Sequence, residues 1–157
     1  MNEAALRQAG QDLIDDYVEL IDADKLEEWL ELFTEDCSYK VVSRENVEQN
    51  LVVPFVLCTN KNMLRDRIVS LREANKYNLH YDHHIVSNVR VRPMEGGMAT
   101  LSASYAVYQT TLEGRSQLFS VGRYQDKVRW EGDRLKFVEK LVITDTFAVL
   151  SLLATPL

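Results

Sequence analysis

The sequence predicts an α+β domain in which one curved, antiparallel or mixed sheet wraps over three N-terminal helices to form a cone. Helical patterns are grouped in the first half of the chain, and long strand patterns with a period of two follow them. Helices grouped early and a meander late favour separate layers over an alternating parallel fold. The 157 residues are expected to form a single domain, with residues 146–157 as an apolar tail.

The three longest strand patterns lie between Met98 and Asp145, and the rest of the chain is organised around them. Along each pattern β-branched and aromatic residues alternate with other residues, and turns are expected at Gly114 and Gly132. Strands of this length must twist strongly and curl over another layer. Gly122, inside the second pattern, is therefore expected to form a bulge or bend.

The alternation also assigns faces along the third of these strands. Leu135, Phe137, Glu139, Leu141 and Ile143 alternate with Lys136, Val138, Lys140 and Val142, so Phe137 and Lys140 are expected on opposite faces.

Two helices are expected before the first strand. Residues 3–22 carry apolar side chains at helical spacing with acidic side chains between them. A capping box at Asp24 is expected to begin a second, short helix. The buried side of this helix is expected to end at Phe33, and residues 34–36 are expected to terminate it. The alternation over residues 37–41 then predicts the first strand.

The middle of the chain is less regular. Residues 43–59 give the weakest pattern, and Pro54 confines any strand there to a sheet edge. A loop is expected over residues 77–82. A strand is then expected that begins with Ile85, Ser87, Val89 and Val91 on one face and is ended by Pro93 and a turn at residues 96–97.

A third helix is expected over residues 61–76, capped by Thr59 or Asn60. Its apolar side consists of Met63, Leu64, Ile68 and Leu71, and its other side carries three arginines, Arg65, Arg67 and Arg72. Arginines at this spacing could bind an anion, solvate the helix or pair with carboxylates of a partner. We assign these three to a candidate subunit interface.

Composition and charge exclude several classes of protein. The net charge is −6, and residues 1–36 contain 12 acidic against 2 basic side chains, whereas residues 37–157 contain 12 against 16. An acidic chain without a basic stripe argues against a nucleic-acid partner. No apolar run is long enough to span a membrane, and the N-terminus lacks the apolar segment of a signal peptide, so a cytoplasmic location is expected. Cys37 and Cys58 are expected to be reduced core residues.

Three histidines lie within five residues, beside an acidic one: His80, Asp82, His83 and His84. Two histidines and a carboxylate can hold non-haem iron. Here His84 is expected to open a strand and His80 to lie in the preceding loop, so no regular element fixes them on one face. No metal site is therefore predicted.

His84 could instead act as a general base in the mouth of the cone. Its possible partners are Tyr17, Tyr39, Tyr105 and Asp36. The alternative is a buried histidine with a purely structural hydrogen bond, and the sequence leaves both interpretations open.

The C-terminal tail carries no charge over residues 146–157 and contains six large apolar side chains. Such a segment should not be left in water. It could pack on its own core, but we expect it at a subunit interface, with four residues as the candidates: Phe147, Leu150, Leu153 and Leu157.

Several segments in the same order give the chain a family resemblance. They are WLELFTEDCSY (29–39), MLRDRIVSLRE (63–73), HHIVSNVRV (83–91), SVGRYQD (120–126) and the apolar Pro-Leu terminus. The sequence resembles the small (β) subunit of Rieske-type aromatic-ring-hydroxylating oxygenases, and most of all those acting on aromatic carboxylates such as terephthalate or salicylate.

The resemblance implies a cone of the nuclear-transport-factor-like, cystatin-like type and an assembly of three β with three α subunits, with β–β contacts. It also implies that the α subunit holds a 2Fe–2S Rieske cluster and mononuclear Fe(II), supplied with electrons from NADH through a reductase. A Rieske centre needs paired Cys and His ligands, and neither Cys37 nor Cys58 has a histidine two residues on. No cofactor is therefore expected in this chain.

Two functions of different class remain at this point. The first is a non-catalytic structural subunit of an oxygenase. The second is a stand-alone lyase or isomerase that uses the cone as its active site, with His84, Tyr17 and Asp36 as candidate catalytic residues.

Overall fold

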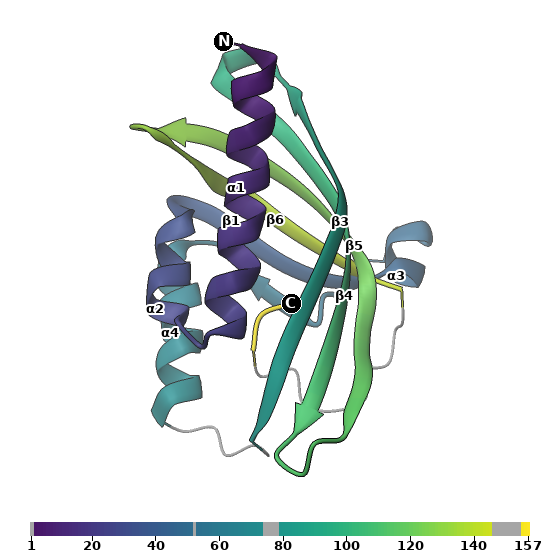
Figure 1. The fold of residues 1–157 in the computed structure, drawn as a ribbon. Helices are drawn as coiled ribbons and strands as arrows, with labels where there is room; N and C mark the ends of the chain where they lie inside the picture. The colour runs from purple at the N-terminus through teal and green to yellow at the C-terminus, as the bar shows by residue number, and fades with distance from the viewer. Residues whose placement is uncertain (1, 52, 74–78, 146–154) are drawn as a thin grey trace.

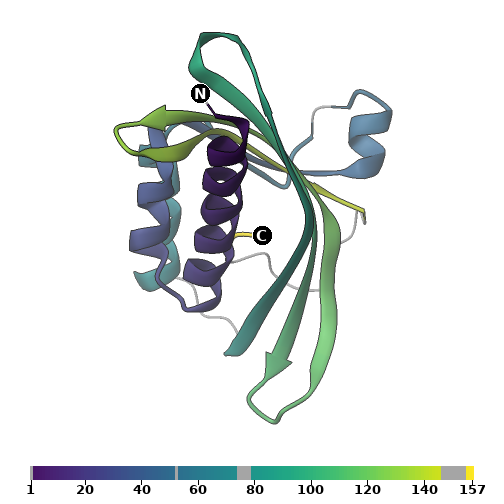
Figure 2. The same cartoon turned by 45° about the horizontal axis from the view of Figure 1, so that its top comes forward.

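The computed structural model of the chain describes residues 2–51, 53–73, 79–145 and 155–157. One sheet runs through it, and its strands follow the order β2 (Val56–Cys58), β1 (Phe33–Ser43), β6 (Arg134–Thr144), β5 (Ser116–Glu131), β4 (Met98–Thr111) and β3 (His80–Pro93). The pair β1–β6 is parallel and the other four pairs are antiparallel. Figures 1 and 2 show the sheet curving around the helices. The predicted α+β cone with a mixed sheet is confirmed.

The helices of the inner layer are α1 (Glu3–Asp22), the short α2 (Leu26–Trp29) with its 3₁₀ extension η1 (Leu30–Leu32), and α4 (Lys61–Glu73). The side chain of Asn60 accepts a hydrogen bond from the Met63 amide at 2.9 Å, as expected for a cap. Of the helix predicted over residues 61–76, residues 74–76 lie outside the described residues. No helix among the described residues has the length and apolar character needed to cross a membrane.

The predicted capping box at Asp24 is wrong. Asp24 has a positive φ of 56°, and its carboxylate accepts a hydrogen bond from Arg72 at 2.7 Å. The residue that caps α2 is Lys25, which makes no side-chain capping bond. Phe33 and residues 34–36 belong to β1, so the first strand begins four residues earlier than predicted.

The short helix α3 (Arg44–Glu48) was not predicted. It stands apart from the other helices in Figure 2. The Ser43 hydroxyl accepts a hydrogen bond from the Asn46 amide at 3.1 Å, which is the usual N-terminal cap. The weak strand expected within residues 43–59 is present as the edge strand β2.

Bulges change the face on which side chains lie in three of the long strands. Extra residues occur in β3 near Asn88, in β5 at Phe119 and in β6 at Val138, where the pairing register shifts. The predicted common face from Ile85 to Val91 is therefore wrong, because Ile85 is 51% exposed while Val91 packs against the core.

Gly122 does not mark a bulge, because the register runs through it without a shift. A Cβ atom at this position would overlap the carbonyl oxygen of Ile143 on β6. Close approach of two strands therefore requires glycine here. The turns predicted at Gly114 and Gly132 are confirmed, and both residues have positive φ.

The core lies between α1 and the concave face of the sheet. Tyr17 of α1 has its ring centre 5.8 Å from that of Trp29, 5.4 Å from that of Phe137 and 5.8 Å from that of Tyr124. The Phe33 ring fills the space between Trp29 and Phe137, with centre distances of 4.7 and 5.3 Å. Edge and tilted contacts of this kind add to the burial of apolar area.

Candidate functional site

The interior of the cone is occupied by the last described residues of the chain. Leu157 is 3% exposed. Its backbone oxygen accepts a hydrogen bond from the Tyr17 hydroxyl at 2.5 Å, and its amide donates to the Tyr39 hydroxyl at 3.1 Å. Burial raises the pKa of both tyrosines, so their hydroxyls stay protonated at neutral pH.

A third contact holds the same segment to the edge strand. The Thr155 hydroxyl donates a hydrogen bond to Asp82 at 2.9 Å, and the other Asp82 oxygen lies 3.3 Å from Nε2 of His80. Both residues belong to β3, which begins at His80. The loop predicted over residues 77–82 is therefore wrong for residues 80–82, and residues 77 and 78 lie outside the described residues.

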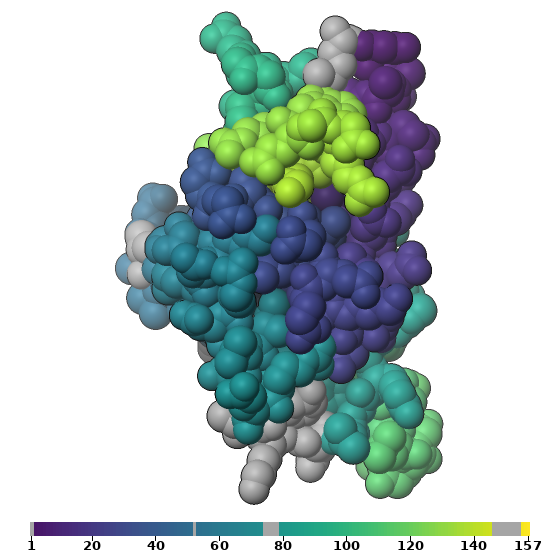
Figure 3. Space-filling model, turned by 90° about the vertical axis from the view of Figure 1, so that its left-hand side faces the viewer, coloured from purple at the N-terminus to yellow at the C-terminus, as the bar shows by residue number. Residues whose placement is uncertain are grey.

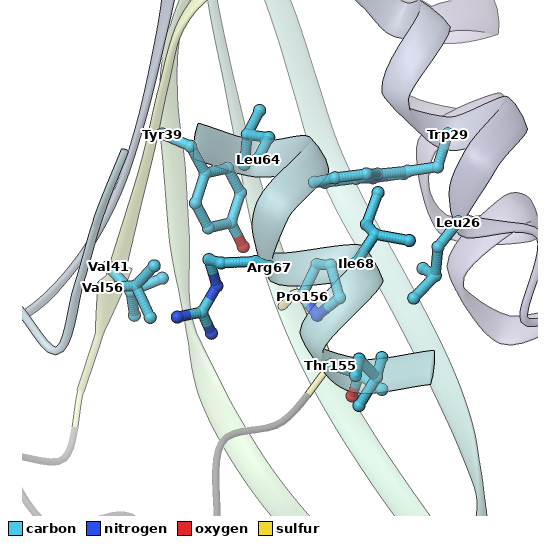
Figure 4. Close-up of a pocket in the computed structure, with 11 residues that line it drawn as sticks. Leu26, Trp29, Tyr39, Val41, Val56, Leu64, Arg67, Ile68, Thr155 and Pro156 are labelled. Atoms are coloured by element: carbon cyan, nitrogen blue, oxygen red, sulfur yellow. The ribbon is translucent and has the colours of Figure 1, made fainter. Parts of the chain in front are cut away.

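Little space remains between this segment and the helices. Figure 4 shows the remaining cavity, with Trp29 and Leu26 on one side, Tyr39 and Val41 on the other, and Pro156 between them. Its volume is about 20 Å³, which is room for about one water molecule. A cavity of this size does not accept an aromatic substrate.

A buried ion pair lies deeper in the cone. Lys140 Nζ of β6 is 2.9 Å from Oδ2 of Asp126 on β5, and neither side chain is exposed to solvent. The ammonium sits over the Tyr124 ring at 3.4 Å and over the Tyr17 ring at 4.3 Å, so cation–π contacts replace part of its hydration. The second Asp126 oxygen accepts a hydrogen bond from the Leu141 amide at 3.2 Å.

Desolvation dominates the titration of this pair. It raises the pKa of Asp126 to about 6 and lowers the pKa of Lys140 to about 8, although each charge offsets part of the shift of the other. Both groups are charged between these two values. The pair was not found from the sequence, because regular alternation puts Lys140 on the outer face. The bulge at Val138 turns it inward.

His84 is fully buried and bound to the end of α1. Its Nδ1 is 2.6 Å from Oδ1 of Asp22, and its backbone amide donates to Oδ2 of the same carboxylate at 2.8 Å. Nε2 of His84 is buried and makes no hydrogen bond within the part of the chain that the structure describes. Asp22 therefore ties α1 to an amide of the edge strand β3.

The candidate catalytic residues do not meet. Tyr17 and His84 are buried and each bonds elsewhere, whereas the Asp36 side chain is 63% exposed and pairs with Arg129 at 2.9 Å. Tyr105 stacks on Tyr124 with ring centres 4.7 Å apart. The geometry does not support the predicted base with Tyr17 and Asp36 as its partners.

The described residues contain no group of three or more His, Cys, Asp or Glu side chains placed to hold a metal ion. His80, Asp82 and His84 share the inner face of β3, so the expectation that no regular element aligns them is wrong. Cys37 and Cys58 are buried and free, and burial raises the pKa of the Cys37 thiol to about 11. This disfavours its thiolate.

The residues assigned to a subunit interface fall into three groups. Arg72 pairs with Asp24 and Glu27 of its own chain, Arg65 bonds to Asn62, and Arg67 lines the cavity of Figure 4. Leu157 lies inside the cone, so its side chain has no surface left for another subunit. The other three candidates, Phe147, Leu150 and Leu153, lie outside the described residues.

Comparison with known proteins gives consistent results. A family model described as the ring hydroxylating beta subunit matches residues 17–151. The anthranilate 1,2-dioxygenase small subunit of Burkholderia cepacia is 43% identical over 90% of this chain and 88% of its own length. The subunit beta 1 of the terephthalate 1,2-dioxygenase terminal oxygenase component from Comamonas sp is 31% identical over 90% of this chain and 92% of its own.

A solved structure agrees with these matches. It is the beta subunit of a proposed aromatic-ring-hydroxylating dioxygenase from Novosphingobium aromaticivorans, and it superposes with a TM-score of 0.88 at 35% identity, covering 99% of this chain and 98% of that one. The cone is thus of the nuclear-transport-factor-like type found in such subunits.

Proposed function

Because the chain belongs to the ring-hydroxylating beta subunit family, we propose that it is the structural, non-catalytic small subunit of a multicomponent Rieske oxygenase acting on an aromatic carboxylate. The names of the two curated relatives support the substrate class, since anthranilate and terephthalate both carry a carboxylate on a benzene ring.

The observation that carries the structural role is the filled cone. Tyr17 and Tyr39, which would face a substrate in an open cone, are instead hydrogen-bonded to Leu157. The remaining cavity holds about one water molecule. Tyr17, Tyr39 and Asp82 therefore fix the chain's own residues 155–157, and chemistry belongs to another subunit.

The partner is a large (α) subunit that carries the 2Fe–2S Rieske cluster and the mononuclear Fe(II), with electrons arriving from NADH through a reductase. Three large and three small subunits form the assembly, in the cytoplasm. The chain has two cysteines, and neither has the Cys-x-His spacing of a Rieske ligand pair. The lack of such a pair supports the placement of the Rieske cluster in the partner.

The test is to produce the chain alone and together with its large subunit, and to measure iron, acid-labile sulfide and turnover of anthranilate and terephthalate with NADH and reductase. We expect no iron and no turnover for the chain alone, and both for the complex. Stoichiometric iron in the isolated chain would contradict the proposal, as would a large subunit that never co-purifies with it.

A further inference from the structure

Two charged grooves flank α1. The first lies between the start of α1 and the second half of β3, where Arg7, Arg90 and Arg92 line it together with Glu3. Among the described residues, none of these three guanidinium groups has a carboxylate within ion-pair distance. This basic groove therefore presents an excess of unpaired positive charge.

The second groove has the opposite sign. It runs between α1, the α2–η1 segment and the β5–β6 hairpin, which Figure 3 shows together on one face. Its lining contains Lys25, Arg134 and Lys136 and twice as many carboxylates, namely Asp12, Asp16, Glu19, Glu28, Glu31 and Asp133.

The carboxylates of this acidic groove are crowded. Partial burial raises the pKa of Asp16. The charge of Arg134 opposes that shift, and the charges of Glu19, Asp12 and Asp15 add to it. Repulsion within the groove would fall if cations approached from outside. The groove is therefore a surface that favours a basic partner.

We propose that the basic groove of one copy of the chain docks against the acidic groove of the next copy. The proposal rests on the proposed function, in which several copies share one assembly. A contact between two different patches of the same chain is heterologous, and it closes into a ring when the rotation permits. A second copy carries both an acidic groove for the basic one and a basic groove for the acidic one. A large subunit would need two separate surfaces of opposite charge to fill the same two grooves.

Charge reversal tests this with two variants of the full-length chain. Arg90→Glu/Arg92→Glu makes both grooves acidic, and Asp12→Arg/Asp16→Arg makes both basic. Each variant alone should associate with itself at least tenfold more weakly than the wild type in sedimentation velocity at low salt. An equimolar mixture of the two should associate again, because each then meets its complement.

The control separates groove docking from the effect of net charge. Arg115→Glu/Arg123→Glu makes the same charge change as Arg90→Glu/Arg92→Glu at exposed positions outside both grooves. Both of its grooves are unchanged, so it should associate with itself as the wild type does. An equal loss of self-association in this control, undiminished self-association of either reversal variant, an equimolar mixture of the reversal variants that does not associate, or a wild type that stays monomeric would overturn the proposal.

The outcome is independent of the large subunit. We expect both reversal variants to co-purify with it and to fold with an unchanged circular dichroism spectrum. If the wild type does not bind a large subunit, the proposed function is wrong. The proposed contact between the two grooves is tested only by the mixing experiment, so the two failures can be told apart.

Discussion

Lys140 and Asp126 form a 2.9 Å ion pair in which neither side chain reaches solvent. Burying two charges is costly, and their mutual attraction offsets the loss of hydration only when the remaining donors and acceptors are also satisfied. Here two tyrosine rings face the ammonium, and the Leu141 amide donates to the carboxylate. The pair therefore joins β5 to β6 directly beneath α1.

Removing one member of this pair should be strongly destabilising. Lys140→Met leaves Asp126 buried without its countercharge, and we expect a loss of about 3–5 kcal/mol in the free energy of unfolding. The double variant Lys140→Met/Asp126→Leu should regain most of that loss, because no buried charge remains. Urea denaturation of the three proteins measures both changes. Equal stability of the single and double variants would show that the two charges are not coupled.

The same pair gives stability a distinct pH dependence. Burial raises the pKa of Asp126 to about 6 and lowers that of Lys140 to about 8. Between about pH 4 and 6, Asp126 is protonated in the native state but ionised in the unfolded state. The contribution of Asp126 to the free energy of unfolding therefore falls as pH rises through this range. Between about pH 8 and 10, Lys140 is neutral in the native state but still protonated in the unfolded state. The free energy of unfolding therefore rises again with pH through this range.

The wild type minus the double variant isolates this contribution from all other titrating groups. We expect the difference in the free energy of unfolding to be least favourable to the wild type between pH 6 and 8. Guanidinium denaturation at pH 4.5, 7 and 9.5 measures it, with values chosen inside the windows set by the two pKa shifts. A difference independent of pH would contradict the assignment.

Gly122→Ala tests the close approach of β5 and β6. The added methyl group meets the Ile143 carbonyl oxygen, which is backbone and cannot rotate away. We expect a loss of about 1–3 kcal/mol or more in the free energy of unfolding. Ser102→Ala, exposed on the outer face of β4, is the control and should stay within about 0.5 kcal/mol of the wild type. Equal melting temperatures would show that the strands can separate at no cost.

The fold could be predicted from the sequence because its signals are local. The period of two in residues 98–145 and the helical period in residues 3–22 both follow from side-chain direction alone. The interior could not be predicted in full, because one extra residue in a strand moves every later side chain to the other face. Val138 does this in β6, so Lys140 is buried where alternation places it outside.

Contacts between distant segments explain the other differences. The sequence around Asp24 is typical of a helix cap. In the structure the Asp24 carboxylate instead accepts a hydrogen bond from Arg72, 48 residues away. The sequence allows Asp36 and His84 to share a site. In the structure Asp36 instead forms an ion pair with Arg129 of β5 at the surface. Leu157 ends an uncharged, apolar segment, which in sequence is typical of a subunit interface. Only the tertiary fold shows that Tyr17 and Tyr39 bind its backbone.

His84→Ala should affect stability rather than catalysis. It removes the 2.6 Å contact with Asp22 and leaves that carboxylate with fewer partners, which costs about 1–3 kcal/mol. His83→Ala is the matched control, because the His83 side chain is exposed and its Nδ1 lies 3.9 Å from Oδ2 of Asp22, so its loss should cost much less. Thermal unfolding compares the two chains. Turnover per assembled complex should equal that of the wild type, and a thousandfold loss in a stable complex would show that His84 is catalytic.

Leu157→Ala tests whether the end of the chain belongs to its own core. The side chain is buried, so its truncation should cost the isolated chain about 2–5 kcal/mol. Leu112→Ala, at an exposed leucine, is the control and should cost less than about 0.5 kcal/mol. Tyr17→Phe should cost about 1–3 kcal/mol, because it leaves the Leu157 oxygen without its donor. If Leu157→Ala left the isolated chain as stable as before and weakened only its binding to other subunits, residue 157 would belong to a subunit interface instead.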